Sequence, residues 1–349
     1  MTITQEVLFE DYASSGLFDD NQLAQIKKGI EDNVDVNYFA DPYYDYVKMY
    51  LIRDGLTKSL DISLYAKKEF NRLQMQEIYD GLLAGVNVKE YADEKYHYLQ
   101  MREIKLALKD SNIQSSDIRK LKDPRYNEKQ LFEIRLGLSK GLNVDWYLNP
   151  AYSDLQMEEI RLGLESNVPP GIYCNPAYES EKICVLREAY NESKINLHDI
   201  VNPAEYNYKQ LFHLYRGYLH HVDIDLYKDP GFSAEQMEWL LYGLLNNVDI
   251  SFYRDKQYNP YQMGQIEQGL EKGLPIRWYL NPKFSWAQME EIRLGLEHGI
   301  DVSEYAKVEI KADKMKQLRL MTEQIVNKSN IQSQSAIVPQ DRMLRRESL

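Results

Sequence analysis

Three histidines that lie close together, His213, His220 and His221, form the group in this sequence whose spacing could bind a metal ion. Two of the imidazoles could share one face of a helix, and Cys184 or His198 could add a further ligand. The same histidines could equally be solvated side chains or helix-capping groups, and neither cysteine belongs to a C-x-x-C pair. We therefore expect no metal site and no cofactor.

The sequence lacks the short motifs that carry common enzyme chemistry. It contains no G-x-x-x-x-G-K-[ST], no G-x-G-x-x-G, no H-E-x-x-H and no G-x-S-x-G. Carboxylates are abundant, but most of them recur at a fixed interval, which is typical of a repeated structural pattern rather than of a unique catalytic pair. We therefore predict that the chain is not an enzyme and has no catalytic residue.

The recurring carboxylates belong to an internal repeat that runs through most of the chain. Each repeat is marked by a Gln-Met or Gln-Leu pair, or by a lysine in place of the glutamine, and nine of the eleven spacings between successive marks are 26 residues. The other two are 30 and 28 residues, so we infer one unit present in twelve copies. Positions within a repeat are numbered here from this Gln or Lys as position 0, which is occupied by Gln22, Lys48, Gln74, Gln100, Gln130, Gln156, Lys182, Gln210, Gln236, Gln262, Gln288 and Lys314.

Each repeat is predicted to form one α-helix and one shorter helical turn. Positions 1, 4 and 8 are apolar in almost every repeat, as in Met157, Ile160 and Leu164, which is the pattern of an amphipathic helix. Position 11 is often Gly or Asn, which accept the left-handed conformation that closes a helix, so the helix should span about eleven residues. An Asp or Ser can then cap a short second turn, which a proline halts. Because one repeat cannot fold alone, the predicted fold class is an all-α solenoid of about twelve repeats.

Two further positions of the repeat indicate how it packs. Position 7 is glycine in nine repeats, for example Gly163, and becomes Ala107 and Ala189 in the two repeats with insertions. A glycine inside a helix costs about 1 kcal/mol, so we expect its missing side chain to let the next repeat approach closely. Position 17 is aromatic in all nine repeats of 26 residues. This ladder favours a buried aromatic core, with hydroxyls reaching the surface, over a cofactor site.

The phrase QMEEIRLGLE occurs at residues 156–165 and again at 288–297. It resembles tandem repeats of Gram-positive gut bacteria and of their mobile elements, to which no named activity is attached. The unit of one helix and one tighter turn is also similar in architecture to leucine-rich-variant solenoids, although their sequence motif is absent. The resemblance covers roughly residues 18–326, implies a helical-repeat fold, and transfers no site residue.

The periodicity also predicts how the chain is organised. We expect an N-terminal cap at residues 1–17, a solenoid at 18–326 with possible breaks near 100–129 and 182–209, and a flexible polar tail at 327–349. No run of 18 apolar residues could cross a membrane, no secretory signal opens the sequence, and only two cysteines are present. These features favour a cytoplasmic protein.

Position 5 of the repeat forms a basic row that could follow an RNA strand at one base per repeat. Its members could instead form i, i+4 ion pairs along their own helices, as Arg161 could with Glu165. The row also breaks at Tyr215, Leu241 and Glu267, so RNA binding is the weaker interpretation. The basic members are Lys27, Arg53, Lys105, Arg135, Arg161, Arg187, Arg293 and Arg319.

The eighth and ninth repeats depart from the common pattern at positions that a helical wheel places away from the apolar stripe. Position 3, elsewhere often glutamate, becomes His213 and Trp239, and position 6 becomes Arg216 and Tyr242. Together with Tyr215, these residues are predicted to form a partly exposed aromatic and basic patch across adjacent helices. Trp, Tyr and Arg dominate protein-binding hot spots, so these five are the predicted binding residues. Packing of Trp239 on a neighbouring short helix is the alternative.

The formal net charge of -12 disfavours indiscriminate binding to nucleic acid or to an anionic membrane. The leading hypothesis is a non-enzymatic helical-repeat module or scaffold that binds another protein. The alternative is an acidic inhibitor that mimics nucleic acid and blocks a nuclease or defence enzyme, and the second alternative is an RNA-binding repeat protein. The sequence does not indicate the partner or the oligomeric state.

Overall fold

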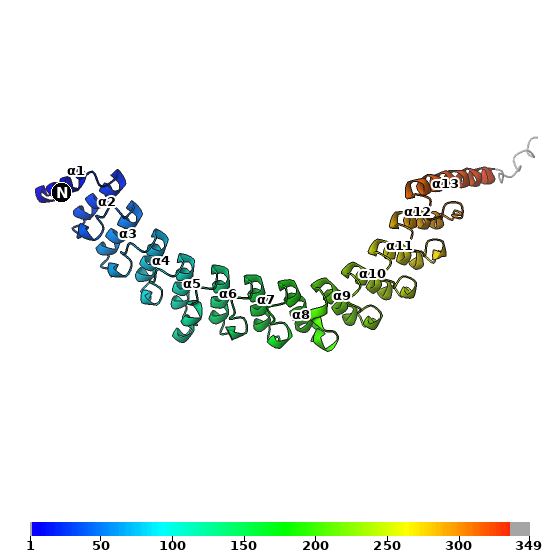
Figure 1. Ribbon diagram of the computed structural model, residues 1–349, viewed down its shortest axis with the longest axis horizontal. Coiled ribbons are helices and arrows are strands. Elements are labelled where there is room, and N and C mark those ends of the chain that lie inside the picture. Colours follow the sequence, from blue (N-terminus) through cyan, green and yellow to red (C-terminus); the bar gives the residue numbers. More distant parts are fainter. Residues whose placement is uncertain (1, 336–349) are drawn as a thin grey trace, which may run out of the picture. The chain divides into compact units, whose positions relative to one another are not determined.

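The computed structural model describes residues 2–335 and consists, over these residues, of α-helices joined by loops that contain short 3-10 helices, with no β-strand (Figure 1). The all-α solenoid predicted from the repeat is confirmed. None of the helices within the described residues is both long enough and apolar enough to cross a membrane. The α-helices are α1 (Ile3–Ser14), α2 (Asp20–Glu31), α3 (Tyr46–Thr57), α4 (Arg72–Leu83), α5 (Tyr98–Lys109), α6 (Glu128–Ser139), α7 (Asp154–Glu165), α8 (Ser180–Ser193), α9 (Tyr208–Leu219), α10 (Ala234–Leu245), α11 (Pro260–Glu271), α12 (Trp286–Glu297) and α13 (Ala312–Ser335). The 3-10 helices are η1 (Val36–Tyr38), η2 (Ile62–Leu64), η3 (Val88–Glu90), η4 (Ser115–Leu121), η5 (Val144–Trp146), η6 (Pro170–Ile172), η7 (Leu197–Asp199), η8 (Pro203–Glu205), η9 (Ile224–Leu226), η10 (Ile250–Phe252) and η11 (Ile276–Trp278).

The start of a typical repeat helix is closed by the glutamine at position 0. In α4, Oδ1 of Asn71 accepts a hydrogen bond from the backbone N–H of Gln74 at 3.0 Å, and Oε1 of Gln74 accepts one from the backbone N–H of Asn71 at 2.9 Å. Nε2 of Gln74 then donates to the backbone carbonyls of Glu94 and Tyr96, at 3.1 and 2.8 Å, in the loop that leads to the next helix. The recurring glutamine thus satisfies helix-end amides and ties each repeat to the loop that follows.

The helix ends of the nine repeats of 26 residues confirm the prediction for position 11. The backbone is left-handed there, with φ of 54° at Asn33 and 69° at Gly85. The same conformation occurs at Ser59, with φ of 57°, and at His221, with φ of 58°. These two residues lack the tolerance of glycine or asparagine, so geometry rather than residue type sets the helix end.

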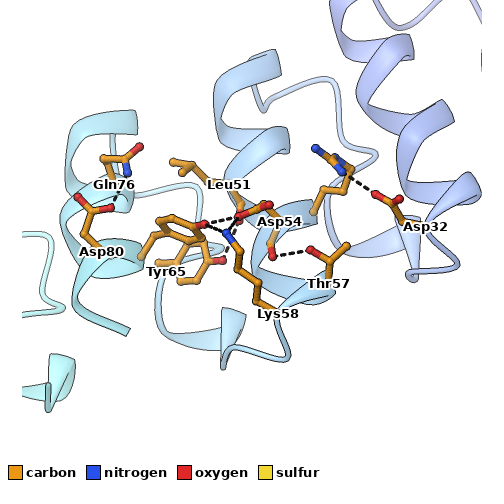
Figure 2. A network of polar contacts seen from close by, with 10 residues as sticks. Asp32, Leu51, Asp54, Thr57, Lys58, Tyr65, Gln76 and Asp80 are labelled. Carbon is orange, nitrogen blue, oxygen red and sulfur yellow. Dashed lines mark hydrogen bonds and ion pairs between the residues drawn. The ribbon is translucent and has the colours of Figure 1, made fainter. Parts of the chain in front are cut away.

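The glycine at position 7 makes room for an aromatic ring of its own repeat. A methyl group added at Gly55 would lie 1.9 Å from Oη of Tyr65. Tyr65 is fully buried, and its hydroxyl donates to the carbonyl oxygen of Leu51 at 2.9 Å (Figure 2). The predicted buried aromatic core is confirmed. Two related expectations are wrong, because the glycine accommodates its own repeat rather than the next one, and the hydroxyl is bonded inside the core rather than at the surface.

The two repeats with insertions show the converse arrangement. Ala107 and Ala189 are buried at position 7, and neither repeat has an aromatic residue at position 17. Aliphatic side chains, Ile118 and Leu121 in one repeat and Leu197 in the other, lie in the core instead. Because a methyl group and an aromatic ring cannot fill the same space, glycine and the ring occur together or are both absent.

The chain divides into two compact units, Met1–Arg187 and Glu188–Leu349, with the boundary inside α8. In the first unit, α1 to α7 pack in chain order, each helix against the next (Figure 1). In the second unit, α9 to α13 pack in the same way. Each unit therefore buries the sides of its helices against neighbouring repeats, as a solenoid requires.

Both ends of the array are helical within the described residues. Helix α1 lies within the expected cap at residues 1–17 and packs against α2. Helix α13 continues to Ser335, so the first residues of the expected tail are helical, and residues 336–349 lie outside the described residues. The breaks expected near 100–129 and 182–209 stay predictions.

Candidate binding surface

The basic row at position 5 lies between neighbouring helices. In α7, Nε of Arg161 donates to Oε2 of Glu133 at 2.6 Å, and Glu133 comes from position 3 of the preceding repeat. The two side chains are only 8 and 9 % exposed. Arg161 also pairs with Glu165, which confirms the i, i+4 pair predicted on this helix. The expectation that position 3 faces solvent is wrong, because the following helix covers it.

The same contact between neighbouring repeats recurs along the chain. Most cations of the basic row therefore form ion pairs or hydrogen bonds inside the protein. Seven of the eight cations, all but Lys27, reach a carboxylate or amide of the preceding repeat, so the row does not present a free set of charges to a phosphate backbone. This observation weighs against an RNA-binding row. The further pairs are Arg53 with Asp32, Lys105 with Glu77, Arg135 with Glu103, Arg187 with Glu159, Arg293 with Gln265, and Arg319 with Glu291.

The row is interrupted in the second unit, where Tyr215, Leu241 and Glu267 stand at position 5. His213 is 8 % exposed, and its Nδ1 has no hydrogen-bond partner among the described residues. Burial lowers the pKa of His213 below its ordinary value, so the ring is neutral near pH 7. Tyr215 is 6 % exposed, and its hydroxyl donates to Oε2 of Glu192 at 3.0 Å. These two predicted binding residues are therefore buried rather than presented on the surface.

The other three predicted binding residues are half-buried or exposed. On α10, the ring centres of Trp239 and Tyr242 lie 6.0 Å apart. Trp239 is half-buried over α11, where a methyl group added at Gly264 would lie 2.7 Å from its Cζ2 atom. The guanidinium of Arg216 lies 5.8 Å from the ring centre of Phe212 on α9. The structure thus brings Trp239 and Tyr242 together, but the five residues do not form one exposed patch, because positions 3 and 5 face neighbouring helices.

Sequence reasoning identified Tyr242 but missed that it belongs to a row of exposed aromatic side chains, with one member on each of four consecutive helices. Phe212 on α9 is 42 % exposed, Tyr242 on α10 is 38 %, Tyr261 on α11 is 69 % and Trp286 on α12 is 44 %. The ring centres of Tyr261 and Trp286 lie 5.9 Å apart. We call these four residues the outer aromatic row. Their signal in the sequence is an aromatic residue on the helix face opposite positions 1, 4 and 8, where a polar residue is expected.

The first unit carries a comparable set of exposed apolar residues, with one member on each helix from α3 to α7. Its members, the outer apolar row, are Tyr50, Leu73, Leu106, Phe132 and Leu155. Their exposed fractions run from 36 % at Leu106 to 56 % at Leu155. A contiguous exposed apolar surface is typical of a site that contacts a partner, whereas single exposed apolar side chains are common, so a set that continues over successive helices is a candidate for such a contact.

Two of the three histidines considered as metal ligands, His220 and His221, lie at the end of a helix. His220 is the C-cap residue of α9, and His221 takes the left-handed conformation that follows it. Among residues 2–335, no three His, Cys, Asp or Glu side chains are arranged to hold a metal ion. Comparison of the chain with protein families, with curated proteins and with solved structures gives no match.

Proposed function

We propose that this chain is a non-enzymatic helical-repeat protein that binds another protein through the outer faces of its α-helices. The observation that carries the proposal is the outer aromatic row, whose four side chains are 38 to 69 % exposed. Aromatic side chains bury a large apolar area on binding and are enriched at the hot spots of protein interfaces.

The row is not needed to complete the fold of its own unit. The core of a repeat there is filled by the ring at position 17, such as Tyr227, which is fully buried. Contacts between helices use positions 3 and 5, such as His213 and Leu241, which are also buried. Large apolar groups left on the surface of an otherwise satisfied fold support a role in binding.

The charge of the chain favours a protein partner over a polyanion. The chain carries a net charge of -12, and most of the basic row is paired within the protein. An aromatic interface should weaken little with ionic strength, whereas an acidic surface that mimics nucleic acid should weaken steeply. Salt dependence therefore separates the leading proposal from the alternative of an acidic inhibitor.

The test is capture of partners by the immobilised full chain from a lysate of the source cells, quantified by mass spectrometry. Three proteins are compared: wild type, Phe212→Ser with Tyr242→Ser, and Phe252→Ser. Phe252 is a matched control, since it is an aromatic residue of the same unit that is 45 % exposed but lies on η10 rather than on an α-helix.

We expect the double variant to weaken capture at least tenfold, or about 1.4 kcal/mol, and Phe252→Ser to leave it unchanged. Circular dichroism checks that both variants fold, as the exposure of all three residues implies. Capture that survives the double variant but disappears after nuclease treatment or at raised salt would overturn the proposal.

A further inference from the structure

A groove of about 490 Å³ lies in the first unit where α3, α4 and α5 begin. Its lining includes Lys48, Arg72, Leu73, His97 and Tyr98, with Asp45 as the one carboxylate. Cationic and apolar groups therefore meet in one concave site, at the edge of the outer apolar row to which Leu73 belongs.

Lys48 stands where most repeats have glutamine, and it is only 9 % exposed. Its Nζ lies 5.4 and 6.0 Å from the ring centres of Tyr43 and Tyr44, and within residues 2–335 it forms no hydrogen bond or ion pair. The carbonyl of Lys68, which a glutamine would reach, instead accepts from the hydroxyl of Tyr43 at 3.3 Å. Most of the Lys48 residue is therefore buried, but its ammonium group has no anion of the described residues beside it, so the site is suited to an anion from outside the chain.

The start of α5 supplies a second place for an anion. Asp45 and Asn71 accept hydrogen bonds from first-turn amides of α3 and α4, but His97 makes no such bond at the start of α5. The first-turn amides of α5 therefore remain available as donors at the positive end of the helix dipole. Between the two places, Arg72 is exposed and has no ion-pair partner among the described residues.

The groove suits an acidic peptide better than a polyphosphate. Leu73 is 42 % exposed and Tyr98 is half-buried, which offers apolar contact beside the cations. Asp45 would repel a continuous row of phosphates, and the chain as a whole is acidic. A peptide can place carboxylates at the cationic places and apolar side chains between them.

We propose that this groove binds an extended acidic segment of the partner protein, an inference that rests on the proposed protein-binding function. Packed helices lie about 8–10 Å apart, and an extended chain advances about 3.3 Å per residue. One repeat therefore corresponds to about three residues, so the segment carries carboxylates about three residues apart. One carboxylate binds at Lys48 and Arg72, and another binds at the start of α5.

The test uses fluorescence anisotropy with the full chain and two labelled peptides, ELAELAE and its neutral counterpart QLAQLAQ. Lys48→Gln restores the common residue of the repeat, so it should fold at least as well as wild type. Lys314→Gln makes the same exchange at position 0 of the last repeat and is the matched control. A short oligothymidylate serves as the competing polyphosphate.

We expect ELAELAE to bind, QLAQLAQ not to bind, and Lys48→Gln to weaken ELAELAE at least about fivefold while Lys314→Gln has no effect. The proposal would be overturned if both peptides bound equally, or if ELAELAE bound Lys48→Gln as tightly as wild type. It would also be overturned if the oligothymidylate competed more effectively than unlabelled peptide. The proposed function has its own readout in partner capture by the Phe212→Ser, Tyr242→Ser variant. If that variant loses partner capture but the wild-type chain does not bind ELAELAE, the groove proposal is rejected and the proposed function is retained.

Discussion

Exchange of Gly55 for alanine tests the pairing of glycine and aromatic ring that fills the core of most repeats. The new Cβ would lie 1.9 Å from Oη of Tyr65 but 3.2 Å from Cζ, so the hydroxyl is the atom that clashes. Tyr65→Phe removes that oxygen and leaves the ring in place. Wild type, the two single variants and the double variant therefore form a cycle that isolates one contact.

The expected change in the free energy of unfolding follows from three effects of Gly55→Ala. The hydroxyl of Tyr65 has to retreat by about 1 Å, which costs about 1–3 kcal/mol of overpacking. Its hydrogen bond to Leu51 is lost, at about 1 kcal/mol, while the better helix propensity of alanine returns about 1 kcal/mol. We expect a net destabilisation of about 1–3 kcal/mol in wild type, but no loss or a gain of up to about 1 kcal/mol in the Tyr65→Phe background.

The measurement is thermal unfolding of the full chain by circular dichroism, with hydrogen exchange of the α3 amides as a local readout. The local readout is needed because an array of repeats need not unfold in one step. Gly171→Ala is the control, since a methyl group there meets no atom within 4 Å. The reasoning is refuted if Gly55→Ala stabilises the wild-type chain, or if its penalty is the same with phenylalanine at residue 65.

Three further predictions concern stability. Ser59→Gly should stabilise the chain by about 0.5–1 kcal/mol in urea unfolding, because glycine accepts the left-handed conformation at this helix end more readily than serine. An unchanged free energy of unfolding would contradict a conformational cost at Ser59. Arg161→Met should lower the free energy of unfolding by about 3–5 kcal/mol, because Glu133 stays buried without its cation. Adding Glu133→Leu should recover most of this loss, whereas additive losses in the double variant would contradict a coupled pair. Burial raises the pKa of Glu267 above its ordinary value of 4.5, so the folded state holds the proton more tightly and stability falls as pH rises through that window. Glu267→Gln should therefore melt higher than wild type at pH 8 and equally at pH 4, and a difference that is independent of pH would argue against this cause.

Several residues of the candidate surface could be identified from the sequence. Which of them remain exposed after the helices pack could not. Phe212 and Tyr261 stand on the polar side of their helical wheels, which marks them as candidates without any structure. His213 and Tyr215 could not be excluded in the same way, because a wheel does not tell which side of a helix its neighbours cover. Lys48 was visible as a departure from glutamine, but its lack of an anion depends on side chains that only folding brings close.

The sequence by itself determined the repeat, the helix in each copy, the left-handed helix ends and the buried aromatic ladder. These features follow from local periodicity and from backbone preferences that act over a few residues. Only the tertiary structure decided that Gly55 receives Tyr65 of its own repeat and that Arg161 meets Glu133 of the preceding one. The physical reason is that these contacts join residues 10 and 28 positions apart along the chain, and the relative placement of successive helices, which no local pattern specifies, sets which side chains meet.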